Sequence, residues 1–229
     1  MTVLTRTRTA LAVALAAFVG LSACGSETGQ TSVLQTSVNA LRGIIAQRGQ
    51  APLTTAVLKT RLTPQVRAQI GLPVLIAELP TLKVAAVIIL AARNGAVTTW
   101  QSPDGITVST QGGLLKATRG VGFDLMAADV AEPLAIITGS GTGQARRMQR
   151  YLDGENGDVV VRLLCGYTRE GRKVTELCVT DRTALGEPAD LSIQNHYWLD
   201  GQGQIRQSSQ WLGARNGYML LQDPDFVAR

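Results

Sequence analysis

The sequence predicts a mainly β fold, in which an antiparallel meander forms a sandwich or a partly closed barrel and one or two N-terminal helices pack on it. Two observations lead to this fold class. The 229 residues include 24 glycines and only 4% aromatic residues. From residue 72 onward, runs rich in Val, Ile and Thr alternate with turn sequences roughly every ten residues, a pattern typical of sheets built from consecutive hairpins.

The first residues have the features of a secretory signal peptide. Arg6 and Arg8 precede an apolar run over residues 10–21. As a helix this run would be about 18 Å long, too short for the roughly 30 Å hydrocarbon core of a bilayer. The sequence LSAC at residues 21–24 resembles the bacterial lipobox, which implies cleavage before Cys24 and lipidation of that residue. The alternative is an ordinary signal peptide, with Cys24 as an unmodified thiol.

Removal of the signal peptide, residues 1–23, defines the remaining organisation. Residues 24–32 are small and polar and are expected to form a flexible tether to the lipid, and residues 33–229 a single mainly β domain with N-terminal helices. This mature chain carries 20 basic and 17 acidic residues, a net charge of +3. Nucleic-acid-binding proteins have a larger basic excess, so a nucleic acid is not expected as a partner.

Two helices are expected before the strands begin. Apolar residues recur at helical spacing over residues 32–48 and predict an amphipathic helix. Thr63 and Pro64 are suited to the start of a second, short helix, and Gly71 is suited to its end. Amphipathic helices of this kind commonly cover the open face of a sheet.

The strands follow from turn to turn along the chain. Asn94-Gly95 and the sequence SPDG at residues 102–105 mark the clearest turns. Residues 120–135 interrupt the pattern and are expected to form an irregular or short helical excursion. Strands are expected over residues 73–79, 82–92, 97–102, 106–110, 114–119, 158–167, 173–180, 191–200 and 204–212.

Cys165 and Cys178 flank a hairpin-like turn at residues 169–172. In an oxidising compartment they are expected to form a disulfide bond. Closing a loop of this length would stabilise the folded state by about 3 kcal/mol. Two reduced cysteines in the core are the alternative. A metal site and a cofactor are not expected, because the mature chain has one histidine and no Cys-x-x-Cys pair.

A glycine-rich segment, residues 139–143, is compared with phosphate-binding loops. It lacks the Gly-Lys-Ser/Thr ending of a P-loop and is interpreted as a surface loop. Arg146, Arg147 and Arg150 follow it. They are interpreted as a solvated helix face, with contact to an anionic polymer or lipid headgroup as the alternative.

Candidate catalytic residues are scarce. His196 is the only histidine, and neither a Gly-x-Ser-x-Gly turn nor a pair of acids suited to glycoside hydrolysis stands out. We therefore interpret His196 as a hydrogen-bonded residue of a strand, and we expect the protein not to be an enzyme. Trp100, Trp198 and Trp211 lie in expected strands, where an indole can fill the core or stack on a sugar.

Two blocks, residues 99–127 and 195–214, resemble the group 4 capsule polysaccharide lipoprotein family, often called the GfcB/YjbF family. In that family a Trp-x-Ser-x-Asp stretch leads into a hairpin with a Gly-Leu-Leu-Lys-like strand, and an aromatic-Trp-hydrophobic-Asp strand turns into Gly-x-Ile/Val-Arg-Gln-Ser. The lipobox fits as well. The residues that fit these places are Trp100, Ser102, Asp104, Gly113, Leu114, Leu115, Lys116, Trp198, Asp200, Gly203, Ile205, Arg206, Gln207 and Ser208.

This resemblance implies a lipoprotein of the outer membrane, anchored through Cys24 and facing the periplasm. It implies a noncatalytic accessory role in the synthesis or export of capsule or extracellular polysaccharide, with the polymer or export components as partners. Gly25 follows Cys24 where an Asp would favour retention in the inner membrane. The resemblance implies no reaction and no catalytic residues.

Four residues are candidate polysaccharide contacts: Lys116, Arg206, Trp100 and Trp198. If the strand face of Arg206 forms a groove, Arg206 and Lys116 could hold an acidic sugar, and if it is a core edge, Arg206 pairs with a carboxylate. Two other functions stay open. The continuous apolar run over residues 82–92 suits a lipid-binding cavity as well as a buried strand, and a polysaccharide-modifying enzyme is the third alternative.

Overall fold

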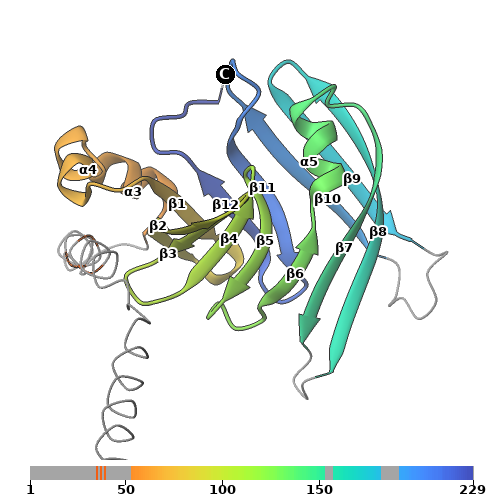
Figure 1. The fold of residues 1–229 in the computed structure, drawn as a ribbon, viewed down its shortest axis with the longest axis horizontal. Helices are drawn as coiled ribbons and strands as arrows, with labels where there is room; N and C mark the ends of the chain where they lie inside the picture. The colour runs from red at the N-terminus through yellow and green to blue at the C-terminus, as the bar shows by residue number, and fades with distance from the viewer. Residues whose placement is uncertain are drawn as a thin grey trace, which may run out of the picture. The chain divides into compact units, whose positions relative to one another are not determined.

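The computed structural model describes residues 35, 37, 39, 53–152, 157–181 and 191–228. Its contacts divide the chain into residues 1–35 and 36–229, and apart from residue 35 the described residues belong to the second unit. There, antiparallel strands form one continuous sheet that curls into a nearly closed barrel (Figure 1). The expected mainly β fold is confirmed. The signal peptide, the tether and Cys24 lie outside the described residues.

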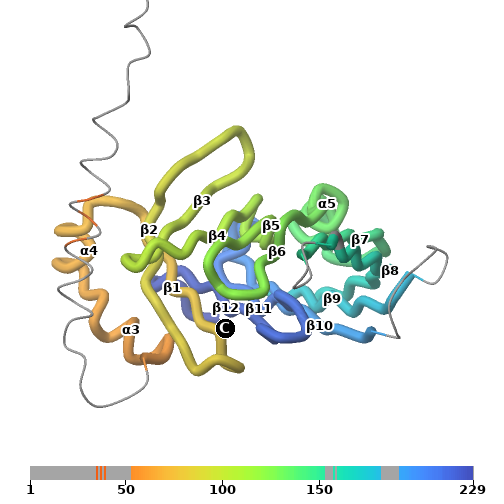
Figure 2. Tube along the Cα trace, turned by 90° about the horizontal axis from the view of Figure 1, so that it is seen from below, coloured from red at the N-terminus to blue at the C-terminus, as the bar shows by residue number. Residues whose placement is uncertain are grey.

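The sheet consists of two meanders that meet at one strand pair, β1 with β12. The first meander contains β1 (Val74–Leu79), β2 (Val84–Asn94), β3 (Val97–Gln101), β4 (Thr107–Gln111) and β5 (Leu114–Arg119). The second contains β6 (Leu125–Asp129), β7 (Gly143–Leu152), β8 (Asp158–Glu170), β9 (Lys173–Thr180), β10 (Ser192–Leu199), β11 (Ile205–Gly213) and β12 (Gly217–Gln222). Strands β5 and β6, consecutive in the chain, are the two edges of this sheet (Figure 2).

Two short helices, α3 (Thr55–Arg61) and α4 (Pro64–Ile70), precede the sheet. The predicted signals of α4 are confirmed: the Thr63 side chain accepts a hydrogen bond from the amide of Val66, and Gly71 ends the helix at φ 67°. Helix α3 has no counterpart among the predicted elements. No helix of the described part of the chain combines the length and apolar character that a membrane span requires.

Helix α5 (Ala131–Thr138) and the turns at one end of the barrel pack together. Leu134 lies so close to Gly112, in the β4–β5 turn, that an added Cβ at Gly112 would stand 2.7 Å from it. On the opposite side Arg169 of β8 donates to the carbonyl of Ile137 at 2.7 Å. The helix therefore bridges the first and second meanders where the sheet itself is open (Figure 1).

One sequence interpretation is wrong. Arg146, Arg147 and Arg150 lie on strand β7, not on a solvated helix face. Residues alternate between exposed and buried along β7, so Arg146 and Arg150 are exposed while Arg147 is only 1% exposed. The expected excursion over residues 120–135 contains strand β6 and the start of α5.

A side chain of β11 forms hydrogen bonds with the backbone of edge strand β5 and of the turn before it. The Gln210 side chain, from β11, accepts from the amide of Leu115 at 2.9 Å and donates to the carbonyl of Gly113 at 2.9 Å. Its amide nitrogen also lies 2.9 Å from the Ser208 hydroxyl. These contacts hold β5 against β11 across the interior.

Candidate functional site

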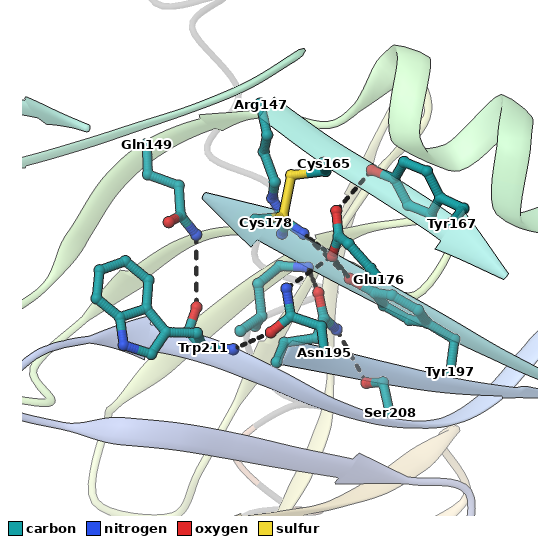
Figure 3. A network of polar contacts seen from close by, with 12 residues as sticks. Arg147, Gln149, Cys165, Tyr167, Glu176, Cys178, Asn195, Tyr197, Ser208 and Trp211 are labelled. Carbon is teal, nitrogen blue, oxygen red and sulfur yellow. Dashed lines mark hydrogen bonds and ion pairs between the residues drawn. A yellow bond between two sulfur atoms is a disulfide. The ribbon is translucent and has the colours of Figure 1, made fainter. Parts of the chain in front are cut away.

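A buried polar network occupies the interior of the second meander, with Glu176 of β9 at its centre (Figure 3). One carboxylate oxygen accepts hydrogen bonds from Arg147 at 2.6 Å, Asn195 at 2.6 Å and Tyr197 at 2.7 Å. The other accepts from Tyr167 at 2.6 Å. Each of these side chains faces inward because strands β7 to β10 alternate in burial.

Arg147 and Glu176 form an ion pair whose two side chains are 0% exposed. Burial acts to lower the pKa of Arg147, but Glu176 and the neighbouring tyrosines outweigh it, and the pKa is raised. Arg147 therefore stays charged. Within the described residues its Nε and Nη2 atoms meet no acceptor, so Nη1 carries the contacts to Glu176 and Tyr197.

The two tyrosines of the network act as neutral donors. Burial, and after it the negative charge of Glu176, raises the pKa of Tyr167 and that of Tyr197 far above the usual value. Both phenols stay protonated and donate hydrogen bonds to the carboxylate. A carboxylate saturated by four donors and enclosed by the sheet is suited to holding strands together and poorly suited to acting as a base or nucleophile.

The network continues into the backbone of β11. Asn195 accepts from the amide of Trp211 at 2.7 Å, and Gln149 of β7 donates to the carbonyl of Trp211 at 3.4 Å (Figure 3). The β11–β12 register shifts between Trp211 and Gly213, so these side chains meet backbone groups beside an irregularity of the ladder. Five strands, β7 to β11, are thereby joined through polar contacts.

Cys165 and Cys178 form the predicted disulfide bond beside this network. The two residues are paired directly across β8 and β9, with Cα atoms 4.0 Å apart, and both are fully buried. Together with Glu176 they are the group of potential metal ligands that lies close together in the described part of the chain. Sulfur atoms that are bonded to each other cannot act as thiolate ligands, so this set does not fit a metal.

Two of the candidate polysaccharide contacts, Trp100 and Lys116, lie in the first meander and are engaged in contacts within the protein. The indole of Trp100 donates to the Thr110 hydroxyl at 3.0 Å and packs against the core. The ammonium of Lys116 donates to the carbonyl of Ala128, in β6, at 3.1 Å. Both side chains are partly buried, and their contacts are structural.

Arg206 pairs with carboxylates, which was one of the two alternatives for this residue. Its guanidinium lies 2.9 Å from Asp200 and 3.1 Å from Asp223. Asp200 also accepts from the amides of Gln202 and Gln204, and these bonds together with Arg206 outweigh burial and lower the pKa of Asp200.

Arg206 and Ser208 are two positions apart on β11, a spacing that places residues of a regular strand on one face, but here they lie on different faces. The ladder shifts there, since Trp198 pairs with Gln207 and Leu199 with Ile205. Arg206 is exposed in this bulge, whereas Ser208 is buried. Arg206 and Lys116 thus have separate sets of partners, and a shared contact with a sugar stays a prediction.

Trp198 is partly exposed on the outer face of β10. Lys173 of β9 lies 5.6 Å from the centre of its ring, and His196 stacks at 5.8 Å with a tilt of 53°. The Nδ1 atom of His196 lies 3.2 Å from the Thr175 hydroxyl. Burial, and after it the charge of Lys173, lowers the pKa of His196, which favours the neutral ring. Trp100 and Trp198 are both partly exposed, and of these two Trp100 is the one that packs against the hydrophobic core.

The chain is similar to known proteins in fold and in sequence. The crystal structure of the hypothetical lipoprotein YmcC from Escherichia coli (K12) has the same fold, with a TM-score of 0.61 and 17% identity over 76% of this chain and 93% of that chain. No match is found among curated proteins. Residues 51–223 match the family model described as group 4 capsule polysaccharide lipoprotein gfcB, YjbF. The chain therefore belongs to the group 4 capsule polysaccharide lipoprotein family.

Proposed function

We propose that this protein is an outer-membrane lipoprotein that serves capsule or extracellular polysaccharide synthesis or export as a noncatalytic accessory. The observation that carries the proposal is the family match over residues 51–223. The lipobox-like sequence that ends at Cys24 supports a lipid anchor, and Gly25 after it supports sorting to the outer membrane, with the domain facing the periplasm.

The chemistry of the described residues supports a noncatalytic role. Glu176 and its tyrosines are saturated by one another inside the sheet, and Asp200 is engaged by Arg206 and by backbone amides. His196 shares its Nδ1 atom with a threonine hydroxyl and not with a carboxylate. The charged centre of the interior also favours this role over storage of an acyl chain, since a lipid tail would have to pack against a buried ion pair.

Deletion of the gene tests the proposal. The deletion strain should show reduced or altered surface polysaccharide, and complementation should restore it. A His196→Ala protein should complement as well as the unaltered protein. Unchanged polysaccharide in the deletion strain would contradict the accessory role, and a folded His196→Ala protein that loses polysaccharide modification in vitro would contradict the noncatalytic role.

Anchoring has its own test, in which Cys24→Ala is compared with the unaltered protein. Radiolabelled palmitate should enter the unaltered protein alone, and that protein should co-fractionate with outer-membrane porins on a sucrose gradient. Equal labelling of both proteins would refute lipidation at Cys24. Recovery of the labelled protein with inner-membrane markers would refute the proposed location.

A further inference from the structure

We propose that the outer face of strands β9, β10 and β11 binds a segment of acidic polysaccharide, with Trp198 as the stacking platform and Lys173 as the contact for a sugar carboxylate. This inference rests on the proposed function and names the ligand and the surface. The six outward residues that form this surface, the outer strip, are Lys173, Thr175, His196, Trp198, Gln207 and Ser209.

The strand register places the outer strip in two straight rows. Trp198 pairs with Lys173 on one side and with Gln207 on the other. His196 pairs in the same way with Thr175 and Ser209. With neighbouring strands about 4.8 Å apart, each row extends about 10 Å across the sheet, a length comparable with that of a disaccharide.

The alternation of burial shows that these rows face outward. All six residues are partly exposed, whereas the residues that lie between them along each strand are buried: Val174 at 0%, Tyr197 at 0% and Ser208 at 1% exposure. The outer strip therefore lies directly over the Glu176 network, on the opposite side of the same strands. A rigid network beneath holds the rows in place without using the outer side chains.

The side chains of the outer strip have the chemistry that sugars require. An indole offers a flat apolar surface, and an imidazole, an amide and two hydroxyls offer hydrogen bonds to sugar hydroxyls. Aliphatic side chains are absent from these six positions. The exposed Leu164, Leu177 and Val179 lie instead on the neighbouring part of β8 and β9, at 41%, 52% and 46% exposure. The outer strip is thus polar and aromatic, which favours a sugar over a lipid or an apolar protein surface.

Charge favours an acidic sugar. None of the six residues is a carboxylate, and the Lys173 ammonium is 5.6 Å from the centre of the Trp198 ring. Glu170 stands opposite Lys173 in the β8–β9 register, and Arg172 lies in the turn between them, so these three residues together carry one positive charge. A sugar stacked on Trp198 would present its carboxylate to Lys173.

The test measures binding of the purified protein to polysaccharide extracted from the surface of the producing cells, with neutral dextran as a control polymer. Trp198→Ala should weaken binding about tenfold or more, as expected for a central aromatic contact, and Trp198→Phe should retain most of it. Lys173→Ala should remove the part of the affinity that salt weakens, whereas Lys83→Ala, an exposed lysine near β2, should change nothing.

Unfolding curves of each variant check the fold, and Thr175→Val serves as a second, nearly isosteric probe if Trp198→Ala is unstable. Failure of the unaltered protein to bind the extracted polymer would overturn the inference, and so would wild-type affinity in the folded variants. Equal binding of dextran would overturn the acidic specificity. In cells, a Trp198→Ala protein that restores surface polysaccharide in the deletion strain would show that the outer strip is not needed for the function. That result would not contradict the accessory role.

Discussion

The inner and the outer faces of strands β9 and β10 differ in charge and in aromatic content. Charged groups usually lie outside and aromatic groups inside, but here the inner face contains an ion pair and the outer face carries aromatic side chains. Inside, the fully buried Glu176 accepts hydrogen bonds from Arg147, Asn195 and two tyrosines. Outside, Trp198 and His196 leave aromatic surface in contact with solvent. Buried charge has to be matched by partners in the fold, whereas exposed aromatic surface is open to a ligand. The inner face therefore holds the strands together, and the proposed polysaccharide contact lies on the outer face.

Removal of the inner carboxylate should have the largest effect on stability. Glu176→Gln should lower the free energy of unfolding by about 3–5 kcal/mol, because it leaves Arg147 as an unpaired buried charge. Thr175→Ala, the adjacent outward residue, is the matched control and should change stability little. Denaturant unfolding monitored by tryptophan fluorescence measures both, and equal midpoints for the two variants would disprove the distinction between the faces.

A double variant tests whether the Arg147–Glu176 ion pair contributes net stability. Arg147→Met combined with Glu176→Leu removes both charges, so it should be more stable than Glu176→Gln alone. If the double variant is the less stable of the two, the ion pair contributes net stability and is not only a matched pair of buried charges.

Loss of the disulfide should have the next largest effect. Reduction of Cys165–Cys178 should lower the free energy of unfolding by about 3 kcal/mol, through the greater freedom of the unfolded chain. Alkylation of the denatured, unreduced protein should first show that neither of these cysteines is free. Quantitative labelling of both would contradict the bond itself.

Gln210→Ala tests the contact between β11 and β5. It should lower the free energy of unfolding by about 1–3 kcal/mol, since the backbone groups of Leu115 and Gly113 would lose their partner. Amide hydrogen exchange should accelerate at Leu115 and much less in β9. Uniform acceleration throughout the sheet would indicate global destabilisation and no local role at the edge.

The smallest expected effect concerns pH and the outer face. The pKa of His196 is lowered below its ordinary value of 6.5, so protonation favours the unfolded state. The contribution of His196 to stability is therefore present above that value and decreases as the pH falls through it. Relative to His196→Gln, the unaltered protein should lose less than about 1 kcal/mol between pH 8 and pH 5. Lys173→Ala should reduce this difference, and a gain of stability in acid would contradict it.

The sequence predicts the parts of this fold whose signals are local. Thr63, Pro64 and Gly71 delimit α4 by capping chemistry, and residues 173–180 form β9 with the predicted bounds. The Cys165–Cys178 bond follows from a hairpin turn between two cysteines. Each of these predictions depends on neighbouring residues alone.

Strand β7 and the network could not be predicted in this way. The inward positions of β7 carry Ala145, Arg147, Gln149 and Tyr151, so hydrophobic alternation is missing and three arginines suggest a solvated face. Burial of Arg147 depends on Glu176, which is on another strand. The one available signal was Glu176 in KVTELC, an acid on the same strand face as Val174 and Cys178. The bulge at Arg206 likewise depends on the pairing of β10 with β11.

The direct pairing of Cys165 with Cys178 has a consequence for how the chain folds. A slip of β8 against β9 by one residue would turn one sulfur to the opposite side of the sheet, where the bond cannot close. The disulfide bond is therefore compatible with the observed register and not with one shifted by a single residue. Glu176 precedes Cys178 by two residues, so the register that allows the bond also directs the Glu176 carboxylate to the interior.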